Sequence, residues 1–131
     1  MSFYLGIWNS PTAISDNEAA RQYLALGDEK PVQSKFDSQV YAFYCRLTAL
    51  YPEVEMVPED ELSACPWDCS IDMPGGHVIM AIQFERSQEI LPQVVSLAEQ
   101  YALVCFDPQA GRVYLPPHLR VIEAGMAKRS A

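Results

Sequence analysis

Apolar side chains repeat along this chain with two spacings, one typical of strands and the other typical of helices. The alternation of a strand is clearest in residues 77–85, where every second position holds a large apolar residue. Aromatic and β-branched residues predict a first strand over 3–8, and shorter apolar runs predict strands over 70–73 and 102–106. A last apolar run favours an edge strand at 113–115.

Apolar residues three and four positions apart predict three helices between these strands. The first covers about 17–26 and begins after Ser15 or Asp16, whose side chains can accept hydrogen bonds from the free N–H groups of its first turn. The second begins at Ser34 and ends before Pro52, because proline lacks the N–H that a helix interior needs. The third follows the alternating strand directly and carries its apolar residues on one side.

The resulting order of elements, β-α-α-β-β-α-β, predicts an α+β fold of the ferredoxin-like kind, an antiparallel sheet with helices on one face. We expect one domain over 1–117, followed by a partly disordered C-terminal tail over 118–131. Both sides of the predicted strand 3–8 are apolar, so the sheet needs a second cover. The connection 52–68, the tail or a second subunit can supply it, and the apolar residues of the connection favour the first.

Charge is distributed very unevenly along the chain. The net charge is −8, and residues 47–85 contain no Lys or Arg, whereas acidic and basic residues balance elsewhere. The acids of this stretch are Glu53, Glu55, Glu59, Asp60, Glu61, Asp68, Asp72 and Glu85. A one-sided negative field attracts basic partners and repels polyanions. The sequence therefore favours a basic protein partner over nucleic acid or an anionic membrane.

The sequence also indicates where the protein acts. No apolar run approaches the roughly 20 residues that span a bilayer, and the N-terminal residues lack the basic region of a secretion signal. We therefore expect a cytoplasmic protein whose cysteines are thiols. A monomer and a homodimer both stay open, since a second subunit could cover the other face of the sheet.

Residues 52–68 hold three prolines and most of the acids, and they show neither helical nor strand spacing. A long irregular connection inside a compact domain is often functional, and an aromatic ring surrounded by charge suits an interface. The predicted partner-binding residues are Glu53, Glu55, Glu59, Asp60, Glu61, Trp67 and Asp68. The plainer interpretation of these acids is a solvated surface, and their spacing fits no Ca²⁺-binding EF-hand loop.

A second hypothesis is a small-molecule-binding or enzymatic site in a pocket between the sheet and the connection. Asp72 and His77 flank a predicted turn and could act as a base and its orienting partner, with Asp107 as a third polar group. A role in or beside tight turns is the simpler explanation of all three residues. The sequence contains no nucleophile elbow, Walker loop or dinucleotide fingerprint, so it does not favour an enzyme.

The cysteines do not form a metal-binding pattern. Cys65 and Cys69 are one residue further apart than a redox Cys-x-x-Cys pair, and no second close pair completes a zinc site. We predict no metal and no cofactor. Cys45 and Cys105 lie in apolar segments and are expected to be buried.

Several packing and turn residues resemble a family of small bacterial proteins of uncharacterised function. The matching pieces are Phe3–Trp8, Tyr51-Pro52, Pro66-Trp67, the segment from Glu89 through Ala98, and Leu103–Gln109. The resemblance covers most of residues 3–115 and brings no catalytic motif with it. Some similar small acidic proteins look like immunity partners of secreted bacterial toxins, so the resemblance implies a binding role. We therefore expect a non-catalytic protein-binding domain with an acidic face, with toxin neutralisation as one form of that role and homodimerisation as a further alternative.

Overall fold

The computed structural model describes residues 1–27, 35–74 and 76–120. Its centre is a four-stranded antiparallel sheet with the strand order β2-β1-β3-β4, and mixed helix and strand confirm the predicted α+β class. The strands are β1 (Ser2–Trp8), β2 (His77–Gln83), β3 (Val104–Asp107) and β4 (Arg112–Tyr114). The long β1 lies in the middle and pairs with β2 along its whole length.

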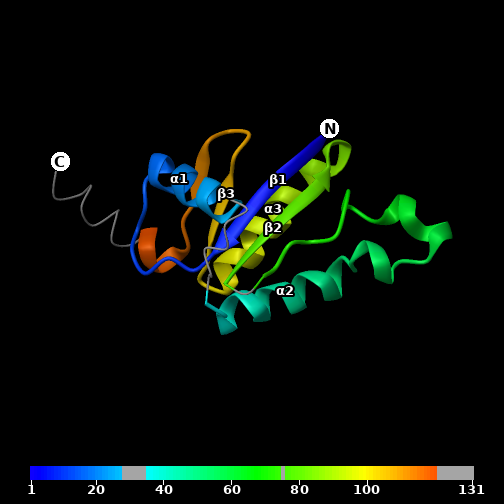
Figure 1. Cartoon of the computed structure of the whole chain (residues 1–131), viewed down its shortest axis with the longest axis horizontal. Helices are drawn as coiled ribbons and strands as arrows, with labels where there is room; N and C mark the ends of the chain where they lie inside the picture. The colour runs from blue at the N-terminus through cyan, green and yellow to red at the C-terminus, as the bar shows by residue number, and fades with distance from the viewer. Residues whose placement is uncertain (28–34, 75, 121–131) are drawn as a thin grey trace.

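Helices cover both faces of this sheet, rather than the single face that the sequence predicts. The helices are α1 (Asp16–Leu26), α2 (Ser38–Leu50) and α3 (Ser87–Gln100). α2 and α3 pack against each other and against one face, whereas α1 contacts β3 and β4 on the opposite face. Figure 1 shows α2 on the β2 side of the molecule and α1 on the β3 side. The prediction of helices on one face is therefore wrong for α1.

The two faces of β1 explain this arrangement. Leu5 and Ile7 are buried in the main core, which α2 and α3 complete, whereas Trp8 is buried in a second core beneath α1. Gly6 lies under the ring of Tyr23 on α1, where a Cβ atom would come 2.7 Å from the ring Cδ1 atom. The missing side chain at Gly6 therefore lets α1 approach the sheet closely.

The connection 52–68 does not supply the second cover. Trp67 and the partly buried side chains of the connection pack into the main core, on the face that α2 and α3 already cover. The other face is covered by α1 and by Leu119, which belongs to the predicted tail. Residues 121–131 of that tail lie outside the described part of the chain. The cover is intramolecular, as expected, but α1 and Leu119 of the tail supply it instead of the connection.

The end of the connection extends the sheet instead. Residues 66–72 run antiparallel to β2 along its outer edge, where the N–H of Asp68 donates to the carbonyl of Ala81 (2.9 Å). Asp72 and Ile79 exchange backbone hydrogen bonds of 2.9 and 2.8 Å. The predicted short strand before the turn is therefore a single bridge rather than a regular strand, and the edge of β2 is covered.

The boundaries of the helices follow their caps. The Ser15 hydroxyl accepts a hydrogen bond from the N–H of Glu18 (3.1 Å), which confirms the predicted start of α1. α2 begins later than predicted, because the carboxylate of Asp37 accepts two N–H groups of its first turn at 2.9 and 3.0 Å. Ser34, the predicted cap, lies outside the described residues.

The strongest strand prediction is correct except at its end. β2 stops at Gln83, and Phe84–Arg86 form a 3₁₀ turn, η3, that leads directly into α3. Phe84 is exposed as a result, instead of continuing the buried row of the strand.

Candidate functional site

Most acids of the charge-rich stretch lie in one connection, residues 53–68, which we call the acidic segment. It contains two 3₁₀ turns, η1 (Val54–Met56) and η2 (Glu59–Ala64). Figure 1 shows both turns beyond the end of α2, on the side of the molecule away from α1. Glu59, Asp60 and Glu61 form the first turn of η2, and all three are exposed. Carboxylates suit this position because the free N–H groups at a helix start carry partial positive charge.

Glu53 fastens the beginning of the acidic segment to its neighbours. Its carboxylate accepts one hydrogen bond from the Tyr44 hydroxyl on α2 (2.5 Å) and another from the backbone N–H of Ile71 (2.8 Å). The hydrogen bond to Glu53 raises the pKa of Tyr44 to about 12, and burial and the negative charge of the carboxylate act in the same direction. Glu53 is therefore a structural residue that joins three segments of the chain.

Hydroxyl groups hold two further acids of the segment. The Ser70 hydroxyl donates to the carboxylate of Glu55, and the Ser2 hydroxyl donates to that of Asp68. Both carboxylates stay exposed at the surface. Their negative charges are oriented but not neutralised by these contacts.

Trp67 is a core residue and does not present its ring at the surface. Only 3% of its surface is exposed, and its indole N–H donates to the carbonyl of Tyr51 (3.0 Å). The Tyr51 ring meets it edge to face, with 6.2 Å between the ring centres. That Trp67 contacts a partner stays a prediction, and the structure places its ring in the main core.

The described ion pairs leave out the exposed acids of the segment. Within residues 1–27, 35–74 and 76–120, the ion pairs are Arg86–Glu89 (2.8 Å) and Arg120–Glu99 (3.2 Å), and both lie outside the segment. No described Lys or Arg forms an ion pair with Glu59, Asp60 or Glu61. Arg112 and Arg120 lie at or near β4, at the opposite edge of the sheet from the end of the acidic segment.

An apolar groove of about 260 Å³ lies beside the acids, between the end of α2 and the two 3₁₀ turns. The residues that line it are Leu50, Tyr51, Pro52, Met56, Val57, Pro58, Glu61, Cys65 and Pro66. Leu50 and Met56 keep 50% and 77% of their surfaces exposed. We call this feature the α2 groove. Its apolar walls and its single acidic lining residue, Glu61, place apolar and negative surface side by side.

Sequence reasoning missed the α2 groove because its walls come from separate segments that show no shared pattern. One available signal was Leu50, which continues the apolar stripe of α2 to its last residue, where the side chain is half exposed. The other was Met56 and Val57, two apolar residues in a segment otherwise rich in acids and proline.

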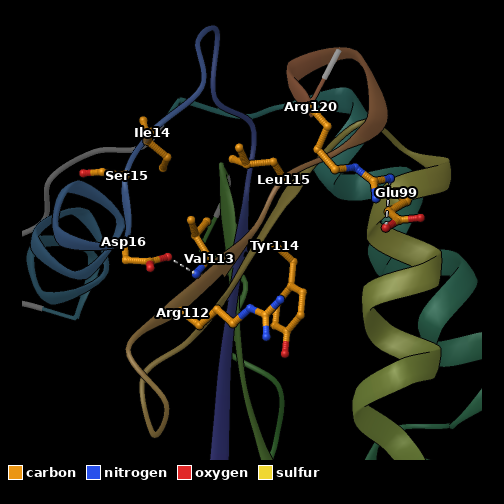
Figure 2. Close-up of a pocket in the computed structure, with 9 residues that line it drawn as sticks. All are labelled: Ile14, Ser15, Asp16, Glu99, Arg112, Val113, Tyr114, Leu115 and Arg120. Atoms are coloured by element: carbon orange, nitrogen blue, oxygen red, sulfur yellow. Dashed lines mark hydrogen bonds and ion pairs between the residues drawn. The ribbon is translucent and has the colours of Figure 1, made fainter. Parts of the chain in front are cut away.

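A larger cavity of about 410 Å³ follows the outer edge of β4 (Figure 2). Its floor is the consecutive run 112–115, and its walls come from residues 14–16 at the start of α1 and from Glu99 and Arg120. Figure 2 shows Asp16 reaching across to β4, where its carboxylate accepts the N–H of Val113 (2.8 Å). This side chain occupies a backbone donor that an incoming strand would need.

The charged groups of this cavity balance. Arg120 pairs with Glu99, and the Arg112 guanidinium lies 5.1 Å from the centre of the Tyr114 ring. Asp16 adds the second negative charge among the lining residues. Two arginines and two acids leave the lining with no net charge.

Comparison with models of known protein families, with curated proteins and with solved structures gives no match to this chain. Function therefore has to be inferred from its own residues. Among the described residues, no helix is long and apolar enough to cross a membrane.

The structure does not gather the three residues of the predicted alternative pocket. His77 lies on β2 and Asp107 lies on β3, and β1 runs between these two strands. His77 and Asp107 are buried, and Asp72 is exposed. Burial lowers the pKa of His77, and the nearby charge of Asp72 partly opposes this effect. Asp72 and His77 thus influence each other, but Asp107 is remote from both.

Asp107 shapes a turn and holds a side chain against β1. Its carboxylate accepts the backbone N–H groups of Gln109 (2.9 Å) and Ala110 (3.2 Å), which confirms the predicted tight turn. It also accepts the side-chain amide of Gln109 (2.6 Å). That amide exchanges hydrogen bonds of 2.6 and 2.8 Å with the backbone of Tyr4, so a side chain extends the pairing of β1 with β3.

The cysteines divide into two buried and two exposed thiols. Cys65 and Cys105 are buried, whereas Cys69 and Cys45 are exposed, so the prediction of burial is wrong for Cys45. Burial raises the pKa of the Cys105 thiol, and the charge of Asp107 adds to the effect, which makes this thiol a poor nucleophile. No group of three or more His, Cys, Asp or Glu side chains that could hold a metal occurs in the described part of the chain.

Proposed function

We propose that this protein is a non-catalytic binding domain whose acidic segment docks onto a basic surface of another protein. The observation that carries the proposal is the state of Glu59, Asp60 and Glu61. All three are exposed, they share one turn, and no described Lys or Arg pairs with them. Carboxylates without an ion pair among the described residues can form one with a partner.

Such a surface acts mainly on the rate of association. A concentrated negative patch attracts a basic partner over a distance close to the Debye length, about 8–10 Å at ordinary salt. It also repels nucleic acid and anionic membranes. Masking the basic surface of a secreted toxin is one role that needs fast association, so a toxin-neutralising immunity protein is one form of this proposal.

The way the acidic segment is held supports a preformed surface. Glu53 ties its start to α2, and the backbone of residues 66–72 ties its end to β2. A surface that is already ordered loses less conformational entropy when it binds. Both anchors are internal, so the intervening acids remain available.

The strand order also supports the proposal that the fold is a variant of the ferredoxin-like fold. If residues 66–72 count as an edge strand, the order along the sheet is that edge, β2, β1 and β3, with α2 and α3 on one face. α1 and β4 would then be additions to the ferredoxin-like arrangement.

We propose a cytoplasmic location with the binding role.

The alternatives have less support. A small-molecule or enzymatic site built on Asp72, His77 and Asp107 lacks a common pocket, because Asp107 bonds within its own turn. A homodimerisation module through an uncovered sheet face has less surface available, because α1 covers part of that face.

Affinity capture from the native host tests the proposal. The bait proteins are the wild type, the variant Glu59→Gln/Asp60→Asn/Glu61→Gln, and a control, Gln88→Lys/Gln93→Lys/Gln100→Lys, that alters exposed residues of α3. Both variants lose three net negative charges. A difference in capture between them therefore reports where the charges lie and not the total charge of the protein. We expect a basic protein to be captured at low salt by the wild type and the control but not by the neutralised variant. Equal capture by all three, or capture of an acidic protein, would contradict the proposal.

A further inference from the structure

We infer that the α2 groove receives an apolar side chain from a partner segment that carries Lys or Arg on both sides of it. The inference rests on the proposed function, because it names the part of a basic partner that the acidic segment would hold. It joins two observations on neighbouring residues: an apolar groove, and a rim of exposed carboxylates that form no ion pair with a described Lys or Arg.

The size of the groove favours a single side chain. Its volume of about 260 Å³ lies below the roughly 300–1,000 Å³ of clefts that hold drug-sized ligands. Leu50 and Met56 on its walls are among the large apolar side chains that stay exposed in this fold. Apolar surface of this kind beside a pocket is typical of sites where a partner buries an anchor residue.

The rim determines the charge of the occupant. Glu61 lines the groove directly, Glu59 and Asp60 share its turn, and Glu55 precedes Met56 in η1. A segment with acidic residues beside its apolar anchor would bring like charges together and be rejected. A segment with basic residues there would form ion pairs at the edge of the groove. Charge complementarity therefore selects a basic segment with one apolar anchor.

The floor of the groove is rigid enough to recognise a shape. The Tyr51 carbonyl holds the indole of Trp67, and the Cys65 thiol contacts the carbonyl of Pro52 at 3.8 Å. Pro58 and Pro66 add fixed backbone to the lining. A groove with such a floor needs little rearrangement when a side chain enters.

Synthetic peptides provide a probe that does not require the natural partner. The first has the core Arg-Lys-Phe-Lys-Arg, the second replaces Phe with Ala, and the third replaces the basic residues with Glu. Each is titrated into ¹⁵N-labelled full-length protein at low salt. We expect the first peptide to bind most tightly and to shift the amide resonances of the groove lining.

Variants then separate the groove from the charge. We expect Met56→Ala and Leu50→Ala to weaken binding of the Phe peptide about fivefold to tenfold each, the effect of losing part of one buried side chain. Leu24→Ala is the matched control, because Leu24 is an exposed apolar residue of α1 outside the groove. All three side chains are exposed, so the variants should fold, and circular dichroism spectra check this.

The outcomes distinguish the groove inference from the proposed acidic docking surface. If the Phe and Ala peptides bind equally, and both respond to Glu59→Gln/Asp60→Asn/Glu61→Gln, the groove inference fails and the acidic docking surface stands. If the basic peptides bind the neutralised variant as tightly as they bind the wild type, the proposed function fails as well. Tighter binding of the acidic peptide would overturn both.

Discussion

The carboxylate of Glu53 lies 2.5 Å from the hydroxyl of Tyr44, and this contact fixes the acidic segment to α2. The other carboxylate oxygen accepts the N–H of Ile71 beside β2. The side chain of Glu53 therefore connects α2, the start of the acidic segment and the segment beside the edge of the sheet. This junction sets the position of the α2 groove and of the carboxylates around it.

The first prediction follows from this contact. Glu53→Gln should lower the pKa of Tyr44 from about 12 toward its ordinary value of 10.0, because the negative acceptor is removed. The folded pKa is raised, so the stabilisation is complete below pH 10, and it is lost as the pH rises through about 12. Absorbance of tyrosinate across this range, with Tyr44→Phe to identify the signal, measures the shift. Glu59→Gln is the control, because Glu59 is not among the groups that raise this pKa; an unchanged Tyr44 titration in Glu53→Gln would contradict the assignment.

The second prediction concerns acid. Burial lowers the pKa of His77 below its ordinary 6.5, so the unfolded chain takes up the proton more readily than the folded one. The stability that neutral His77 contributes is present above pH 6.5, and it is lost as the pH falls from there through the folded pKa. Asp72→Asn should lower the pKa of His77 further, because the opposing charge disappears. NMR titration of the imidazole measures this, with Asp68→Asn as control; a pKa that rises in Asp72→Asn would be the opposite result.

The third prediction tests how α1 meets the sheet. Gly6→Ala should destabilise the protein by about 1–3 kcal/mol, because its Cβ would overlap the Tyr23 ring in a packed interface. Gly27→Ala should cost less, since a Cβ there meets nothing closer than 3.8 Å. Urea unfolding gives both values. The Gly6→Ala cost should shrink in a Tyr23→Ala background, and strict additivity of the two substitutions would show that they do not interact.

The fourth prediction concerns the outer edge of β4. Asp16→Ala should expose the N–H of Val113 and promote pairing of this edge with another chain. Asp16→Asn keeps an oxygen acceptor and should behave more like the wild type. Sedimentation over a range of concentrations should show a larger average mass for Asp16→Ala than for either of the others. Three identical profiles would mean that Asp16 does not protect this edge.

Local signals predicted much of the fold. The alternation in 77–85 identified β2, the spacing after it identified α3, and Ser15 marked the start of α1. These features depend on residues close together in sequence. The placement of α1 could not be read in this way, because both faces of β1 are apolar and its contacts with Gly6 and with the second core join residues far apart in the sequence.

The candidate site was predicted in part. Its acids were found because their charge is a property of composition, but the burial of Trp67 depends on the Tyr51 carbonyl, which is 16 residues away. The α2 groove was missed because it needs the end of α2 to meet both 3₁₀ turns. Glu53 looked like its acidic neighbours, and only its contacts with Tyr44 and Ile71 separate it from them.

The most direct test of the docking surface is the association rate with the captured partner, measured by stopped flow at several salt concentrations. The wild type should associate quickly at low salt and slow steeply as salt is added. In Glu59→Lys/Asp60→Lys/Glu61→Lys the rate should fall at low salt and lose most of this dependence. If the charge-reversed protein associates as fast as the wild type, with the same response to salt, the acidic segment is not the docking surface.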